Sequence, residues 1–207
     1  MEVAKLLSFL EITLKFRDIY RNIKIPGKVS TENDAEHSYQ LAVFCWYIVQ
    51  ADKLPLDTNK IVKYALVHDF VEVYAGDVDA YIADEATIQA KAHREHQARL
   101  RLQQELPEFP EFHDAILEYE SKSNEEARFV YVADKIISEM NVFLEGNTVN
   151  VEQGITIEKF RKIKDPKIAL HPHLEKYWRE FLPLWQELEN KTIIESRGNK
   201  SGRGSCA

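Results

Sequence analysis

The sequence is poor in cysteine, in positive charge and in long apolar runs, and each shortage excludes a class of protein. Its two cysteines, Cys45 and Cys206, are too few for a disulfide framework. The net charge is −7 and the pI is near 5.6, so no strong basic field gathers nucleic-acid polymers. The longest apolar run, residues 41–49, is too short to cross a bilayer, and no secretory signal is visible. We therefore expect a cytoplasmic protein with neither a membrane nor a nucleic acid as partner.

Helical periodicity is what the chain of 207 residues has in abundance. Apolar residues make up 44% and charged residues 29%, as in soluble globular proteins. We expect an all-α fold with one domain over residues 1–190 and a polar, glycine-rich, disordered tail over residues 191–207. Helices are expected over about 3–20, 34–51, 58–75, 84–106, 124–145 and 171–190, with a shorter one after Pro110 and no strands.

Three expected helices carry a histidine or an aspartate on the row of residues that should face the core. His37 heads such a row on one helix, His68 and Asp69 share a row on the next, and Asp134 lies on a third. A core histidine with a hydrogen bond, or a locally paired aspartate, would be the ordinary explanation of each one alone. Because buried charges need partners, one divalent cation shared by all four would satisfy them together. Two imidazole nitrogens and two carboxylate oxygens suit Mn, Co, Fe, Ni or Zn.

Three segments resemble the HD-domain metal-dependent phosphohydrolases, and among them the bacterial 5′-deoxynucleotidase branch and its eukaryotic relatives. They are TENDAEHS (31–38), LVHDFVEVYAGD (66–77) and EEARFVYVADKI (125–136). The resemblance extends over about residues 10–145 and implies a single HD-domain helical bundle with a metal site in its core. It also implies that His37, His68, Asp69 and Asp134 bind one divalent ion, with Mg added to the candidate metals.

The resemblance further implies which side chains act on the substrate. The glutamate of the HDxxE pattern falls on Glu72, which would orient or deprotonate the attacking water. Asp77 would hold that water or assist the leaving 5′-oxygen. A guanidinium would grip the phosphate, and Arg17 and Arg21 are both candidates, because Asp18 stands where the bacterial enzymes have an aromatic residue.

The expected activity is removal of phosphate from (deoxy)nucleoside 5′-monophosphates by a water molecule that the metal activates. Hydrolysis of nucleoside triphosphates or of a signalling nucleotide, and a catalytically silent nucleotide-binding protein, are the alternatives. His93 and His96 suggest a second metal only weakly, because the charges around them indicate a solvated helix face. The resemblance and the apolar last helix suggest a homodimer.

Overall fold

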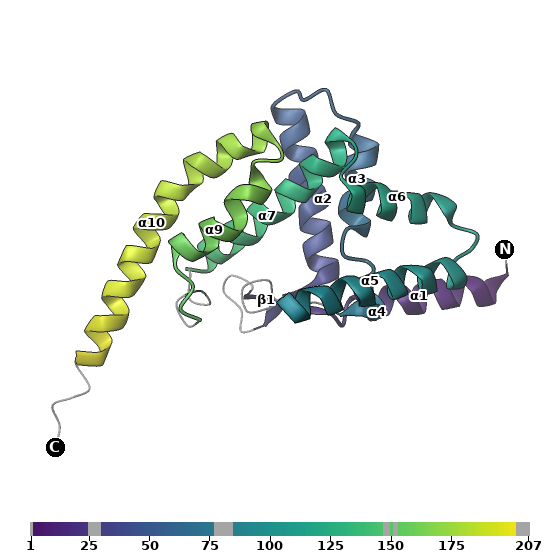
Figure 1. Ribbon diagram of the computed structural model, residues 1–207, viewed down its shortest axis with the longest axis horizontal. Coiled ribbons are helices and arrows are strands. Elements are labelled where there is room, and N and C mark those ends of the chain that lie inside the picture. The colour runs from purple at the N-terminus through teal and green to yellow at the C-terminus, as the bar shows by residue number, and fades with distance from the viewer. Residues whose placement is uncertain (1, 25–29, 77–84, 147–149, 151–152, 202–207) are drawn as a thin grey trace, which may run out of the picture. The chain divides into compact units, whose positions relative to one another are not determined.

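The computed structural model describes residues 2–24, 30–76, 85–146, 150 and 153–201, and it confirms the expected all-α class (Figure 1). Its helices are α1 (Val3–Phe16), α2 (Asp34–Ala51), α3 (Thr58–Val67), α4 (Glu72–Ala75), α5 (Glu85–Glu105), α6 (Pro110–Ser121), α7 (Glu125–Glu145), α9 (Ile157–Ile168) and α10 (Pro172–Ser201). No helix in these ranges is both long and apolar enough to cross a membrane.

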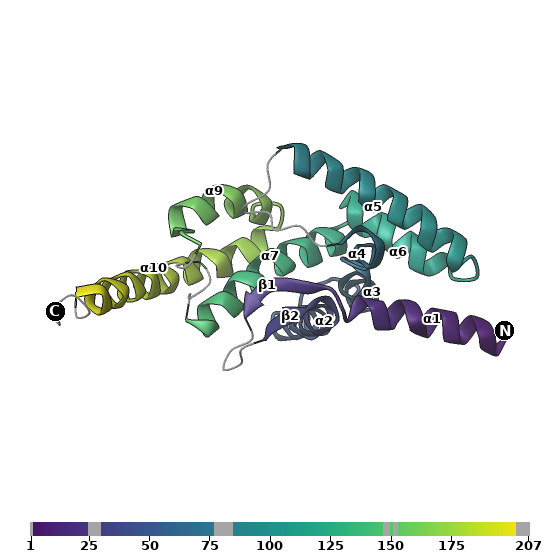
Figure 2. The same cartoon turned by 90° about the horizontal axis from the view of Figure 1, so that it is seen from below.

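Two short strands were not expected from the sequence. The first expected helix ends at Phe16, and the chain continues into β1 (Tyr20–Lys24), which pairs with β2 (Thr31–Asn33) beside the start of α2 (Figure 2). A strand of three or five residues shows too few alternations of apolar and polar side chains to stand out against helical periodicity.

The last part of the chain also differs from the expected boundaries. Helix α9 was not expected, because Pro166 and many charged residues hide its apolar period. Helix α10 continues to Ser201, past the predicted end at residue 190. The remainder of the predicted tail, residues 202–207, lies outside the described residues.

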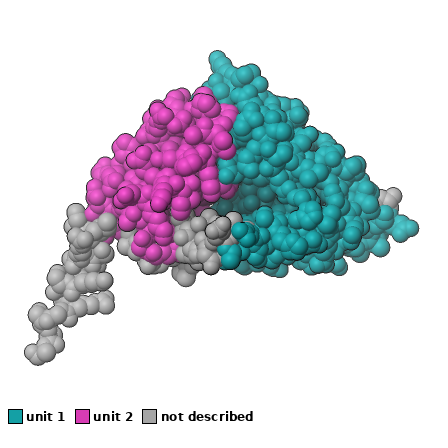
Figure 3. Space-filling view, viewed as in Figure 1, with its two compact units in different colours: residues 1–22, 31–133 teal, residues 23–30, 134–207 magenta. Residues whose placement is uncertain are grey.

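The chain divides into two compact units (Figure 3). Unit 1 comprises residues 1–22 and 31–133, and unit 2 comprises residues 23–30 and 134–207. The boundary therefore falls inside α7, between Ala133 and Asp134. The single domain expected over residues 1–190 stays a prediction.

The core of unit 1 is built where α2 packs on α3 and α3 packs on α6. Leu41 and Cys45 of α2 and Ile61 and Ala65 of α3 are fully buried there. These residues continue the same helical rows that His37 and His68 begin and end, so apolar burial aims both imidazoles inward.

Unit 2 has an aromatic core of its own between α9 and α10. The ring of Phe160 lies 5.5 Å from that of Trp178 and 5.3 Å from that of Trp185, and all three are buried. The indole Nε1 of Trp178 donates a hydrogen bond of 2.8 Å to Asp165. Trp178 and Trp185 of the last helix thus fill the interior of their own unit.

Candidate active site

The first imidazole is positioned by the start of α2. Asn33 accepts a hydrogen bond from the backbone N–H of Glu36, and the carboxylate of Glu36 accepts one from the backbone of Asn33, which completes a capping box. One residue further on, His37 is fully buried, and its ring lies 5.2 Å from that of His68. The buried carboxylate of Glu32 lies 3.4 Å from the Nδ1 atom of His37.

His68 and Asp69 lie in a turn between two helices, whereas the sequence predicted one continuous helix through them. Helix α3 ends at Val67 and α4 begins at Glu72. Across the turn, the N–H of Glu72 donates to the carbonyl of Asp69 at 2.8 Å, a bond from residue i to residue i−3 that tightens the backbone. The tighter turn brings the side chains of Asp69 and Glu72 toward one another.

The hydrogen bonding of His68 leaves one ring nitrogen as a ligand atom. Its Nδ1 lies 2.9 Å from the carbonyl oxygen of Ala65, which can only accept, so Nδ1 carries the proton. In the neutral ring, Nε2 then offers a lone pair, and it lies 3.0 Å from the Oδ2 atom of Asp69. A metal cation near these two atoms could bind both of them.

The residues present fit a divalent metal. Ligand atoms of His37, His68 and Asp69 all lie within 4.8 Å of one another, and the two imidazoles are buried. Nitrogen and oxygen donors in this combination suit Mn, Co, Fe, Ni and Zn. The backbone carbonyl of Ala65 orients the ring of His68. Histidines that bind metals are usually held in this way, through a hydrogen bond from their other ring nitrogen.

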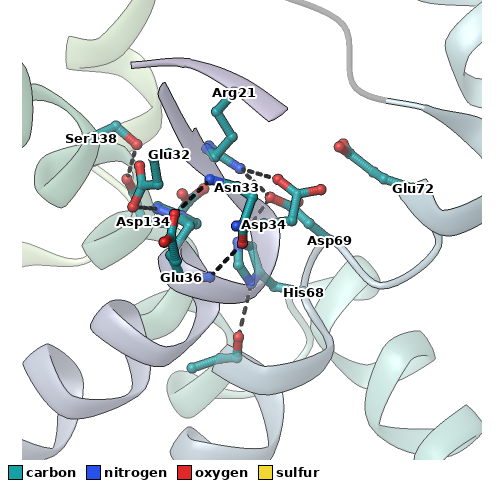
Figure 4. Close-up of polar contacts among 12 residues, drawn as sticks. Arg21, Glu32, Asn33, Asp34, Glu36, His68, Asp69, Glu72, Asp134 and Ser138 are labelled. Atoms are coloured by element: carbon teal, nitrogen blue, oxygen red, sulfur yellow. Dashed lines mark hydrogen bonds and ion pairs between the residues drawn. The ribbon is translucent and has the colours of Figure 1, made fainter. Parts of the chain in front are cut away.

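Arg21 faces this cluster from β1. Its Nη1 atom lies 2.6 Å from Asp69 Oδ2 and 3.5 Å from Asp34 Oδ1, and Asp34 is fully buried (Figure 4). Glu72 points toward the same group, and oxygen atoms of Asp34, Asp69 and Glu72 lie within 4.8 Å of one another.

Arg17, the other candidate for the phosphate, lines a cavity together with Ser38, Val67 and Phe70, which are sequence neighbours of the site residues. The cavity has a volume of about 630 Å³ and is walled by aromatic residues such as Phe16, Phe70 and Phe112. None of His37, His68 or Asp69 lines that cavity.

The structure does not test the predicted roles of two further residues. Asp134 belongs to unit 2, where it is buried, pairs with Lys135 and accepts a hydrogen bond from Ser138 on its backbone carbonyl. Asp77 lies outside the described residues. The residue before it, Gly76, ends α4 with a φ of 72°, a left-handed conformation that favours glycine. The roles of Asp134 and Asp77 stay predictions.

Sequence reasoning missed Lys91, which reaches the site from α5. Its Nζ atom lies 3.1 Å from Glu72 Oε1 and 3.5 Å from Glu95 Oε1. Helix α5 is rich in charge, and one lysine among many gives no signal of its own. His93 and His96 of the same helix are exposed, and neither belongs to a possible metal cluster among the described residues.

Asp34 was also missed as a site residue. The N-cap of α2 is Asn33, and Asp34 follows it as the first residue of the helix. Nothing in the sequence indicated that Asp34 is a site residue, because its partner Arg21 comes from β1, a strand that was not expected.

The fold is shared with solved phosphohydrolase structures. One, named "predicted metal-dependent phosphohydrolase" and coming from Magnetospirillum magnetotacticum MS-1, matches with a TM-score of 0.77 and 25% identity over 92% of this chain and 96% of that one. The model of the HD domain matches residues 14–178. The chain belongs to the HD-domain family.

Curated relatives carry a more specific name. The chain is 34% identical to 5′-deoxynucleotidase HDDC2 of Mus musculus over 140 residues, and 35% identical to that of Homo sapiens over 119 residues. These alignments cover 64% and 56% of this chain. The matched stretch spans 65% of the length of the mouse protein and 53% of that of the human protein.

Proposed function

We propose that the protein is a metal-dependent phosphohydrolase that removes phosphate from (deoxy)nucleoside 5′-monophosphates. One group of side chains supports the proposal. His68 Nε2 faces Asp69 Oδ2, and His37 lies nearby. The carboxylate of Glu72 and the guanidinium of Arg21 lie beside them. The names of the curated relatives and the HD-domain match support the substrate class.

His37, His68 and Asp69 would hold the metal, with Asp134 as the predicted fourth ligand. When bound, a divalent ion lowers the pKa of water and withdraws charge from a phosphate oxygen. The donor set supports Mn, Co, Fe, Ni or Zn over Mg, which prefers oxygen ligands.

The remaining work falls to side chains of the protein. Glu72 is 4% exposed and faces the metal ligand Asp69, so its carboxylate is placed to accept a proton from the attacking water. Arg21 presents a guanidinium that matches two phosphate oxygens, and Asp34 keeps it in place when Asp69 is engaged elsewhere. We assign the phosphate grip to Arg21, and Asp77 keeps its predicted role at the water or at the leaving oxygen.

We further propose a cytoplasmic homodimer. Trp178 and Trp185 of the last helix are buried in unit 2, so these two residues are not available to an interface. Support comes instead from unit 1, where Leu10 and Leu14 of α1 and Trp46 of α2 are each more than half exposed.

The test is phosphate release from a panel of nucleoside mono-, di- and triphosphates, with the metal-free protein and with Mn, Co, Mg or Zn added. We expect release from deoxynucleoside monophosphates only with metal, and a loss of about 10²- to 10⁴-fold in Glu72→Gln. Glu11→Gln, an exposed glutamate of α1, is the matched control and should keep full activity.

Other results would redirect the proposal. Release from triphosphates alone would retain the metal chemistry and reject the monophosphate substrate. Bound metal without release from any nucleotide would favour the catalytically silent binding protein. Equal activity of Glu72→Gln and the wild type would remove Glu72 from the reaction.

A further inference from the structure

Two cations face the acids of the candidate site from different elements. Arg21 of β1 pairs with Asp69 and Asp34, and Lys91 of α5 pairs with Glu72. Because the oxygens of the three acids lie within 4.8 Å of one another, the two cations flank one compact group of negative charge.

The two residues of the ion pair between Lys91 and Glu72 differ in how far their side chains are exposed to solvent. Glu72 is 4% exposed, whereas the side chain of Lys91 is 27% exposed, so the ammonium enters from the solvent side. Burial alone would lower the pKa of Lys91, but the charge and hydrogen bond of Glu72, with smaller contributions from Glu95 and Asp69, raise it. Lys91 is therefore a stable cation at the entrance to the group.

A phosphate monoester dianion brings two negative charges into this group. Arg21 and Lys91 are the cations that the described residues place on Asp69 and Glu72. Charge-assisted hydrogen bonds to phosphate are about as strong as those to a carboxylate. A cation that pairs with a carboxylate can therefore pair with a phosphate instead at little cost. A lysine suits such an exchange, because its ammonium is a compact charge on a flexible stem.

We propose that Lys91 is a ligand of the substrate phosphate, held on Glu72 until the phosphate arrives. This inference rests on the proposed function, since it concerns the same site. When the phosphate enters, the ammonium of Lys91 moves from Glu72 to a phosphate oxygen, and Arg21 binds the phosphate from the opposite side. The ion pair between Lys91 and Glu72 is then broken, which makes the carboxylate of Glu72 a better proton acceptor. No bond other than hydrogen bonds changes in this exchange.

A purely neutralising role for Lys91 makes different predictions. If Lys91 only balanced the charge of Glu72, its removal would free a carboxylate beside the metal ligands and would tighten metal binding. It would leave the affinity for phosphate unchanged. If Lys91 binds phosphate, its removal weakens the binding of phosphate itself.

The experiment compares Lys91→Met, Lys91→Gln and Lys91→Arg with the wild type by titration calorimetry. Mn²⁺ is titrated first, and inorganic phosphate is then titrated into the Mn²⁺-loaded protein. We expect Lys91→Met and Lys91→Gln to bind phosphate about tenfold more weakly or worse, with the Kd for Mn²⁺ within about threefold of the wild type. Lys91→Arg keeps the cation and should restore most of the affinity for phosphate. Lys60→Met, which removes an exposed lysine of α3, is the control and should change neither constant.

Two outcomes would overturn the proposal: unchanged affinity for phosphate in folded Lys91→Met and Lys91→Gln, or no rescue by Lys91→Arg. Circular dichroism melts check that the variants fold, and the arginine variant remains informative if the neutral ones do not. The proposed function is tested separately. If the wild type releases phosphate from no nucleotide but the variants still lose affinity for phosphate, then Lys91 is a phosphate ligand and the nucleotide substrate is wrong.

Discussion

The guanidinium of Arg21 and the carboxylate of Asp69 form a close ion pair, with Nη1 2.6 Å from Oδ2. The same Oδ2 atom lies 3.0 Å from the Nε2 atom of His68. If Asp69 binds the proposed metal through this oxygen, Arg21 and the metal compete for it, and the arginine must give up part of its contact. Asp34, which is fully buried, offers Arg21 a second carboxylate 3.5 Å away.

This shared oxygen leads to opposite effects of one substitution on two ligands. Arg21→Met frees Asp69, so we expect binding of Mn²⁺ to be as tight as in the wild type or tighter. The same substitution removes the phosphate grip, and we expect kcat/KM to fall about 100-fold or more. Calorimetry with Mn²⁺ and phosphate-release kinetics measure the two effects. Arg17→Met is the comparison and should leave the affinity for Mn²⁺ and kcat/KM near those of the wild type. A larger loss of kcat/KM in Arg17→Met than in Arg21→Met would instead make Arg17 the phosphate ligand.

The cap of α2 is expected to support both stability and the site. Asn33→Ala removes the acceptor for the N–H of Glu36 and should lower the free energy of unfolding by about 1 kcal/mol. Because His37 lies in the first turn that this cap fixes, affinity for Mn²⁺ should fall as well. Urea unfolding and calorimetry check the two expectations. Asn59→Ala, at an exposed position of α3, serves as the control; an equal loss there would show that the cap has no special part.

The hydroxyl of Tyr64 links three segments of unit 1, and its contribution to the free energy of unfolding should change with pH in the alkaline range. Its hydroxyl donates to Glu118 of α6 and accepts a hydrogen bond of 2.9 Å from Asn124, just before α7. Tyr64→Phe should cost about 1 to 3 kcal/mol at neutral pH, as measured by urea unfolding. Tyr47→Phe, an exposed tyrosine of α2, should cost almost nothing.

The pH dependence of that loss has a definite sign. Burial, with the bond to Glu118, raises the pKa of Tyr64 from 10.0 to about 12. A raised pKa means that the folded protein holds the phenol proton more tightly, so this stabilisation is complete below pH 10 and is lost as the pH rises toward 12. The difference between wild type and Tyr64→Phe should shrink over that interval. A difference that stays constant would contradict the assignment.

The contribution of Glu105 to the free energy of unfolding should change with pH in the opposite sense, in the acidic range. Burial alone would raise the pKa of Glu105, but hydrogen bonds from Tyr74 and Arg101 outweigh it and lower the pKa below 4.5. The stabilisation is therefore present above that pH and is lost as the pH falls through the lowered pKa. Glu105→Gln should cost less than about 1 kcal/mol at neutral pH, because the group is largely solvated, and nothing in strong acid. Unfolding curves at several pH values, with Glu11→Gln beside them, measure this.

The sequence predicted the helical class and the proximity of His37 to His68 and Asp69, because helical rows are a local property. His37 and His68 stand on rows whose other members are apolar, and burial of those members brings the two imidazoles together. The cap at Asn33 follows from the same local chemistry. These features depend on neighbours within one or two turns.

What the sequence did not reveal depends on contacts between distant segments. The break between α3 and α4 leaves the apolar spacing intact, so periodicity runs straight through it. Arg21 could be preferred to Arg17 only once β1 was seen to lie beside Asp34 and Asp69. Lys91 is separated from Glu72 by the segment 77–84 and stands among many charged residues. Tertiary structure alone selects it.

The pairing of Arg21 with Asp69 and of Lys91 with Glu72 also bears on the order of events during biogenesis. Buried carboxylates without counter-charges would repel one another and make folding depend on an ion. Here the chain supplies the counter-charges, so the polypeptide can fold first and acquire its ion later. We therefore expect a chelator to remove the proposed ion without unfolding the chain.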